Sequence, residues 1–370
     1  MKSRKKYKSY CNENYLRFNL TEDQIWRNFY KEFGEERAEE LNQLFVDRYK
    51  DSSKGNPYNF CKNFRETSTL MYFQSDFFLE NSLKILELFE EIKPTNILEL
   101  GCYNGILLNY LAEKYPSQNF IGVDIEEKII GFAKEKFSQK NLNFLPLEYK
   151  SLFELEDKFD LIFTIFGLEN IPSDIKLDKF EIRNNNDYQA RYDYFNDFFN
   201  NLKKIIKDKA LFCPIVRIPD LNCLMAFFDA ASINQWNLKD NKVEFIESRN
   251  YNSIERIPFF ILEHSSKETN NKKIEVDNFF EITERYRSED NLRYIYLYNK
   301  NKSNFNEVIK NGKIFYKDDQ NTLYYKIYKR LGNFMLFFWA TNGFSYYGEF
   351  KNLDELKKLF LEYTSKELEL

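Results

Sequence analysis

The feature that most constrains the fold is a regular alternation of apolar runs with helical patterns between residues 96 and 166. The apolar runs are short, as buried strands are, and the helical patterns place apolar residues on one face. Strands that alternate with helices in this way are typical of a parallel sheet with right-handed crossovers. We expect strands at residues 96–100, 119–123, 142–147 and 159–166, and helices at residues 105–114 and 126–137.

The alternation continues after a polar, asparagine-rich stretch at residues 173–190, which we interpret as an insertion or lid. Beyond it, two helical patterns alternate with three further apolar runs. The predicted helices are residues 192–207 and 221–231, and the predicted strands are residues 210–218, 243–248 and 258–264.

Two flanking regions have a different organisation. Residues 1–82 are predicted to form a helical extension, in which the basic first twenty residues are a loose arm and Thr21 with Gln24 forms a capping box. One or two amphipathic helices should follow around Gly34, and a longer one from about residue 75 to residue 92. After a polar linker at residues 265–273, residues 274–370 should form a separate α+β domain. Its Tyr- and Phe-rich strands are expected at residues 293–299, 313–317, 322–329, 333–340 and 344–350, with a hairpin turn at Asn342-Gly343 and a last helix capped by Asn352.

Composition excludes several classes of function. The net charge of −4 argues against bulk binding of nucleic acid, which needs a clustered basic surface. No apolar run approaches the roughly 18 residues of a membrane-spanning helix. The single histidine, His264, cannot join others in a metal site, so no metal is predicted and we interpret His264 as structural. The five cysteines form no CxxC pair, and no apolar segment follows the basic start, so we expect reduced thiols and a cytoplasmic protein.

The turn after the first predicted strand of the sheet contains two glycines, Gly101 and Gly105. In open α/β sheets, ligands bind beyond the carboxyl ends of the strands, so this turn is a candidate binding site. Tyr103 stands where the GxGxxG dinucleotide motif has glycine, and no Gly-Lys-Ser/Thr sequence follows. A phosphate-binding loop is therefore disfavoured.

A carboxylate ends or follows each of the first three strands: Glu99, Asp124 and Glu148. A carboxylate after the second strand is suited to accept hydrogen bonds from two ribose hydroxyls. An acidic rim also favours a cationic ligand over a pyrophosphate. Glu148 has the alternative interpretation of a solvated loop carboxylate.

These residues resemble the class I S-adenosylmethionine-dependent methyltransferases over residues 83–265, about half of the chain. The resemblance implies an α/β fold with a seven-stranded, mostly parallel, doubly wound sheet whose last strand is reversed. It also implies S-adenosyl-L-methionine as cofactor, with Glu99 to Gly105 at its methionine end, Asp124 at the ribose, Ile125 beside adenine and Glu148 facing adenine. Tyr103 departs from the glycine that the family usually has. The implied cofactor-binding residues are Glu99, Gly101, Cys102, Gly105, Asp124, Ile125, Glu148, Tyr149 and Phe166. Cys102 has the alternative role of packing beside the turn.

The acceptor site is less well specified. The family often continues the fourth strand into a His-His-Leu-Pro-like turn, where this sequence has Glu169-Asn170-Ile171-Pro172. The missing histidine makes Glu169 our candidate catalytic base, with Tyr188 and Tyr192 as candidate substrate residues. The Asn-Pro-Pro-Tyr signature of amino-directed nucleic-acid methyltransferases is absent.

The resemblance thus predicts a methyltransferase acting on an O or N atom of a small-molecule acceptor. Two alternatives remain open. One is a peptide- or protein-directed methyltransferase whose C-terminal domain binds the substrate chain. The other is a non-catalytic cofactor-binding module.

Overall fold

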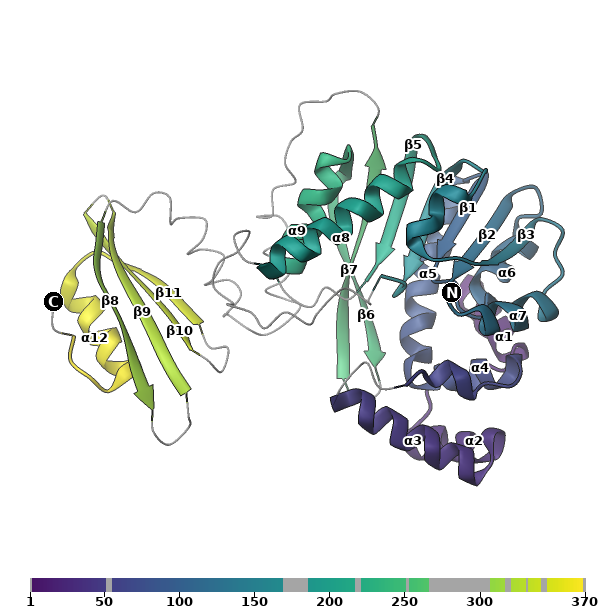
Figure 1. Ribbon diagram of the computed structural model, residues 1–370, viewed down its shortest axis with the longest axis horizontal. Coiled ribbons are helices and arrows are strands. Elements are labelled where there is room, and N and C mark those ends of the chain that lie inside the picture. The colour runs from purple at the N-terminus through teal and green to yellow at the C-terminus, as the bar shows by residue number, and fades with distance from the viewer. Residues whose placement is uncertain are drawn as a thin grey trace. The chain divides into compact units, whose positions relative to one another are not determined.

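The computed structural model describes most of the chain and divides it into two compact units (Figure 1). The first unit comprises Met1–Ile171, Asp193–Arg217 and Asp229–Ile274, and the second comprises Pro172–Tyr192, Ile218–Phe228 and Glu275–Leu370. The described residues are 2–50, 55–168, 186–216, 221–250, 253–265, 307–316, 321–330, 332–340 and 345–368.

The first unit is built on a seven-stranded sheet with the order β3-β2-β1-β4-β5-β7-β6. The first five strands of that order pair in parallel, while β7 is antiparallel to β5 and β6 is antiparallel to β7. The chain moves outward from β1 to β3 and then returns to β4 on the other side of β1, so the topological switch point lies between β1 and β4. The mostly parallel, doubly wound sheet with a reversed strand is confirmed. The strands are β1 Asn96–Leu100, β2 Asn119–Asp124, β3 Leu142–Pro146, β4 Phe159–Ile165, β5 Ile206–Ile215, β6 Trp236–Asn250 and β7 Ser253–His264.

The last two strands are longer than the sequence pattern predicts. They form one hairpin that pairs from Trp236 with His264 to Asn250 with Ser253, with an irregularity between Leu238 and Val243. Backbone hydrogen bonds hold a hairpin together without a continuous apolar pattern. The polar residues 239–242 interrupt that pattern, so the predicted strands at residues 243–248 and 258–264 cover only part of β6 and β7.

Helices cover both faces of the sheet. On β4, Phe163 pairs with Cys213 and Ile162 with Phe212, so Phe163 and Phe212 point to opposite faces. Phe89 of α5 contacts Phe163, and Phe199 of α8 contacts Phe212, which puts these two helices on opposite faces (Figure 1). The helices that follow the extension are α5 Ser75–Ile92, α6 Ile106–Lys114, α7 Glu127–Lys136, α8 Asn186–Lys203 and α9 Leu221–Ile233.

The N-terminal extension is helical, as predicted, and belongs to the first unit. Thr21 and Gln24 form the capping box at the start of α2, and Gly34 ends that helix. The extension contains α1 Lys2–Glu13, α2 Glu22–Phe33, α3 Glu35–Lys50, the 3-10 turns Pro57–Phe60 and Met71–Gln74, and α4 Phe64–Leu70.

The prediction of a loose N-terminal arm is wrong. Residues 2–13 form α1, in which Tyr7 and Cys11 are fully buried, and the Tyr7 ring packs edge-on against Tyr110 at 4.8 Å. The buried residues are four positions apart and form one helix face. Many lysines on the other face concealed this short amphipathic pattern.

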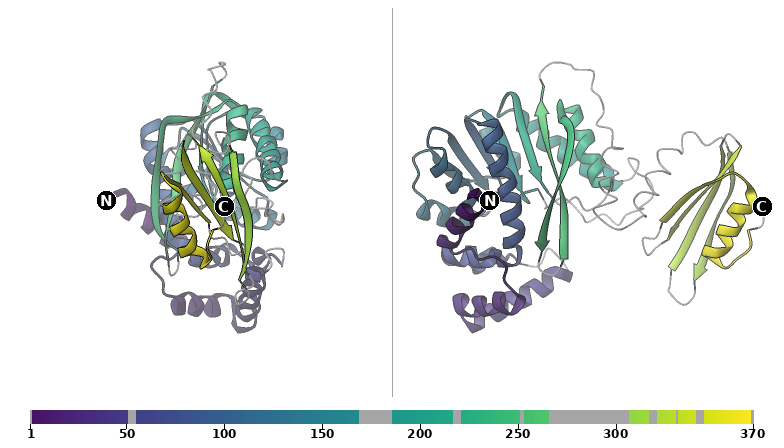
Figure 2. Two further views of the ribbon diagram at one scale, coloured as in Figure 1. Left: turned by 90° about the vertical axis from the view of Figure 1, so that its left-hand side faces the viewer. Right: turned by 180° about the vertical axis from the view of Figure 1, so that it is seen from behind.

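The second unit contains a four-stranded antiparallel sheet with the order β11-β10-β9-β8. Helix α12 lies along one face of it, with Leu356 and Phe360 in the shared core, and Asn352 caps the helix (Figure 2). Its elements are β8 Glu307–Tyr316, β9 Asn321–Arg330, β10 Asn333–Ala340, β11 Ser345–Phe350 and α12 Leu353–Thr364. The predicted strand at 293–299, the turn at Asn342-Gly343, nearly all of the linker and most of the predicted lid lie outside the described residues. The predicted domain boundaries stay predictions.

Two further observations concern the described part of the chain. It contains no helix both long and apolar enough to cross a bilayer. All five cysteines are buried free thiols.

Candidate functional site

The glycine turn between β1 and α6 is fixed to the end of the neighbouring strand. The amides of Gly101 and Cys102 both donate to the Val123 carbonyl, at 2.8 and 3.0 Å. Gly101 has a φ of +71°, in the left-handed region that glycine adopts without strain. A Cβ at Gly101 would lie 2.6 Å from the Cα of Gly167, which follows β4. Glycine is therefore required here, because the loops after β1 and β4 approach closely at the switch point.

Asp124 is the last residue of β2, and its carboxylate accepts hydrogen bonds from the turn after β1 and from the segment after β2. Its Oδ2 accepts the amide of Tyr103 at 2.8 Å, and its Oδ1 accepts the amide of Glu126 at 3.1 Å. Burial raises the pKa of Asp124, and the hydrogen bonds from backbone amides offset this only in part. Each carboxylate oxygen can accept about two hydrogen bonds, so one acceptor position remains on each. Two acceptors side by side fit the two hydroxyls of a ribose.

Glu99 is a buried carboxylate on β1, with 3% of its surface exposed. Its Oε2 has no hydrogen-bond partner among the described residues. Burial and then the negative charge of Asp124 raise the pKa of Glu99 well above its ordinary value. A buried carboxylate without a partner is costly, and a ligand that brings a cation or a donor would relieve that cost. Glu99 therefore fits the ammonium group at the methionine end of S-adenosylmethionine.

The ends of β2 and β3 carry the residues predicted beside adenine. The amide of Leu147 donates to the Asp124 carbonyl at 2.9 Å, which brings the exposed Glu148 close to the end of β2. Ile125 is 61% exposed, an unusual position for a large aliphatic side chain. An exposed apolar side chain next to Asp124 offers a surface for a planar base. These assignments stay predictions.

Three other predicted cofactor residues are partly or fully enclosed by protein. Cys102 is buried, and burial raises the pKa of its thiol well above the ordinary value. The Tyr149 hydroxyl donates to the Gly167 carbonyl, which bridges the segments after β3 and β4. Phe166 has a φ of 62° and stacks on Phe77 of α5 at 4.5 Å. Their backbone and neighbours place them around the switch point, and their roles toward a cofactor stay predictions.

Tyr103 makes contacts that the sequence did not reveal. It has a φ of 49°, the left-handed conformation that glycine would adopt at lower cost. Its hydroxyl donates to the Thr67 carbonyl at 3.0 Å, and the Asn104 amide group donates to the hydroxyls of Thr67 and Ser68 at 3.1 and 3.3 Å. The Tyr58 ring lies 5.3 Å from that of Tyr103. The N-terminal extension thus contacts the glycine turn directly.

One predicted acceptor residue is outside the described part of the chain, and two belong to the second unit. Glu169 lies outside the described residues. Tyr188 and Tyr192 stand near the start of α8, in the second unit, and stack on each other at 6.0 Å. All three assignments stay predictions. His264 packs edge-on against Trp236 at 5.3 Å, and no group of three or more possible metal ligands occurs in the part of the chain that the structure describes.

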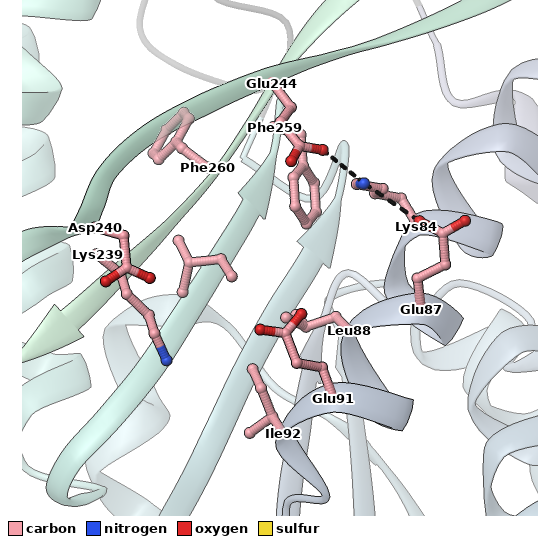
Figure 3. Close-up of a pocket in the computed structure, with 11 residues that line it drawn as sticks. Lys84, Glu87, Leu88, Glu91, Ile92, Lys239, Asp240, Glu244, Phe259 and Phe260 are labelled. Atoms are coloured by element: carbon pink, nitrogen blue, oxygen red, sulfur yellow. Dashed lines mark hydrogen bonds and ion pairs between the residues drawn. The ribbon is translucent and has the colours of Figure 1, made fainter.

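A separate pocket of about 170 Å³ lies between α5 and the β6–β7 hairpin (Figure 3). Lys84 binds Glu244 at 2.6 Å and Glu87 at 3.2 Å at its rim. None of its lining residues belongs to the predicted cofactor site.

Part of the chain is similar to known methyltransferases. Residues 97–180 match the family model described as a methyltransferase domain. The tRNA (guanine-N(7)-)-methyltransferase of Clostridium acetobutylicum is 31% identical over 77 residues, which cover 20% of this chain and 36% of the relative. Malonyl-[acyl-carrier protein] O-methyltransferase 2 of Ilyobacter polytropus is 39% identical over 70 residues, 19% of this chain and 27% of the relative. The chain thus spans about a third of the length of these curated relatives or less.

The solved structure of magnesium protoporphyrin IX methyltransferase from Synechocystis is also similar. It has a TM-score of 0.37 and 14% identity, and the match covers 67% of this chain and 100% of that one.

The family match begins at Ile97 on β1 and includes Glu99, the glycine turn and Asp124. The strand order places the same residues at the carboxyl edge of a doubly wound sheet. Residues 97–180, which carry the glycine turn and Asp124, are therefore similar to a methyltransferase domain.

Proposed function

We propose that this protein is an S-adenosylmethionine-dependent methyltransferase that acts on an O or N atom of a small-molecule acceptor. The observation that carries the proposal is the pair of carboxylates at neighbouring strand ends. Asp124 keeps an acceptor position on each oxygen, and Glu99 has a buried oxygen without a partner among the described residues. One matches the ribose diol and the other the methionine ammonium of the same cofactor.

The bound cofactor supplies a methyl group on a positively charged sulfur, already activated for transfer. Glu99 and Asp124 would hold this cofactor, which would supply the methyl group, and the acceptor's proton would pass to water or to a base. The residues of the chain then have mainly a binding role, since holding the reactants in line accounts for much of the rate. Glu169 is our candidate base, and Tyr188 and Tyr192 are our candidate acceptor residues.

A small molecule is one of several classes of acceptor that the domain could methylate. The similar proteins named above act on tRNA and on an acyl-carrier protein, and the match covers only part of each. The second unit supports a peptide or protein substrate as the alternative, because β8 and β11 are the end strands of its sheet as far as the described residues show. An end strand can pair with an extended peptide. A cofactor-binding module without catalysis is the third possibility.

The test is transfer of a radiolabelled methyl group from S-adenosylmethionine by the full chain. Three acceptor pools are compared: an ultrafiltrate of small molecules, total RNA and a protein fraction. Label in the small-molecule pool that is lost with Asp124→Ala supports the proposal. Label only in protein or RNA replaces it with a macromolecular acceptor, and cofactor binding without label in any pool favours the non-catalytic module. Glu169→Gln in the same assay tests the base, with an expected loss of about 10²–10⁴-fold.

A further inference from the structure

The short turn Pro57–Phe60 of the N-terminal extension is fastened to the segment after β2 on both sides. The Asn56 amide group donates to Glu126 Oε1 at 2.7 Å. The Lys128 ammonium donates to the Asn59 carbonyl at 3.0 Å. Tyr58 lies between these two attachment points in the chain. Its backbone is therefore held at the carboxyl end of β2, where Asp124 is located.

The Tyr58 side chain faces the same place. Its ring lies 5.3 Å from the ring of Tyr103, and the Tyr103 amide donates to Asp124. Burial, followed by the negative charges of Asp124 and Glu126, raises the pKa of Tyr58 to about 12. The phenol therefore stays protonated at neutral pH and can donate a hydrogen bond. It is only partly buried by the protein, which leaves surface for a ligand to cover.

The extension also holds this turn from behind. Arg37 of α3 pairs with the buried Glu66 at 2.7 Å and donates to the Phe60 carbonyl. Phe64 of α4 packs edge-on against Phe137 at 5.2 Å, just after α7. The turn is thus attached to α3 and α4 as well as to the loop after β2. Such support gives Tyr58 a defined position relative to Asp124.

We propose that Tyr58 is a cofactor-binding residue contributed by the N-terminal extension, with its ring forming the outer wall of the nucleoside end of the site. Asp124 holds the ribose from the sheet edge, and Tyr58 covers it from the extension. Binding of the nucleoside then further stabilises the turn Pro57–Phe60. This inference rests on the proposed function for the identity of the cofactor.

The test is calorimetric binding of S-adenosylhomocysteine to the full-length protein and to Tyr58→Ala. Tyr30→Ala is the matched control, because Tyr30 is an exposed tyrosine on α2 of the same extension. We expect about tenfold weaker binding for Tyr58→Ala, the size typical of one aromatic contact with a base, and unchanged binding for Tyr30→Ala. Thermal melting shows whether each variant is folded.

Hydrogen exchange of the parent protein gives a readout that needs no variant. The ligand should slow exchange of the amides at residues 55–62 as well as those at residues 101–105. Unchanged exchange at 55–62, or a folded Tyr58→Ala that binds as tightly as the parent or more tightly, overturns the role of Tyr58. If the parent itself binds no S-adenosylhomocysteine, the proposed function fails together with this inference. If the parent binds and only the Tyr58 results are negative, the proposed function stands.

Discussion

Asp124→Asn removes one charge and one acceptor oxygen at the position where a ribose is expected. In the parent protein the two carboxylate oxygens offer about four acceptor positions, of which the amides of Tyr103 and Glu126 use two. The remaining two match the ribose hydroxyls. Asparagine keeps one oxygen, and its amide nitrogen faces a backbone N–H that needs an acceptor. The variant therefore cannot hold both hydroxyls.

The size of the effect follows from this count of hydrogen bonds. One bond to a charged acceptor is lost, which costs about 1.5–3 kcal/mol, and the other becomes a neutral bond that is weaker by about 1 kcal/mol. The sum of about 2.5–4 kcal/mol corresponds to about 10²–10³-fold weaker binding of the cofactor or its demethylated product. Asp124→Ala loses both bonds and should bind no more tightly than Asp124→Asn.

The assay is calorimetric titration with S-adenosylhomocysteine, and Asp160→Asn is the matched control. Asp160 also accepts two backbone amides, those of Thr95 and Asn96 at 3.0 Å, but at the amino edge of the sheet. Its variant should bind the ligand as the parent does. Asp124→Asn that binds within about threefold of the parent would refute the assignment of Asp124 to the ribose.

Four further outcomes are expected. A cationic ligand favours the ionised form of Glu99, whose pKa is raised by burial and by Asp124, so ligand binding should release a proton and tighten as the pH rises through that pKa. Calorimetric titrations in buffers of different protonation enthalpy should detect this proton release in the parent and not in Glu99→Gln. A parent that releases no proton contradicts the role of Glu99. Gly101→Ala should lower the free energy of unfolding by about 1–2 kcal/mol because of its left-handed backbone alone, and it should weaken cofactor binding because the new Cβ meets Gly167. Urea unfolding measures the first effect and calorimetric titration the second. A variant equal to the parent would show that the loops after β1 and β4 can move apart freely. Burial alone would raise the pKa of Asp160, but hydrogen bonds from Thr95 and Asn96 and from Lys207 lower it. The contribution of Asp160 to stability is therefore present above its pKa in the unfolded chain and is lost as the pH falls through its pKa in the folded chain. Asp160→Asn should reduce the free energy of urea unfolding by about 1–3 kcal/mol at pH 7 and by less in acid, and an equal difference at both pH values would argue against this charge effect. Tyr7→Ala should lower the free energy of unfolding by about 3–5 kcal/mol, the usual cost of removing a fully buried aromatic side chain. Lys6→Ala, on the exposed face of α1, should change that free energy little. A small loss of stability in Tyr7→Ala would mean that α1 adds little to the core.

Local sequence patterns were enough to predict the features that depend on neighbouring residues. The alternation of strands and helices from β1 to β4 follows from local apolar periodicity, and the capping box of α2 follows from Thr21 and Gln24, three positions apart. The prediction of a cofactor site at the Glu99 to Gly105 segment and Asp124 rests on the same kind of local pattern. Each residue there either belongs to one continuous strand–turn–helix or ends the next strand, so its place relative to the sheet edge is set locally.

The distant segments that surround that site could be found only from the folded structure. Tyr103 reaches Thr67 across 36 positions of the chain, and Tyr149 reaches the Gly167 carbonyl across 18. The burial of Tyr7 in α1 depends on a partner more than a hundred residues away, Tyr110. No local period records such contacts, because they depend on how complete helices and strands pack together. The contact of the extension with the glycine turn, through the rings of Tyr58 and Tyr103, therefore became visible only in the folded chain.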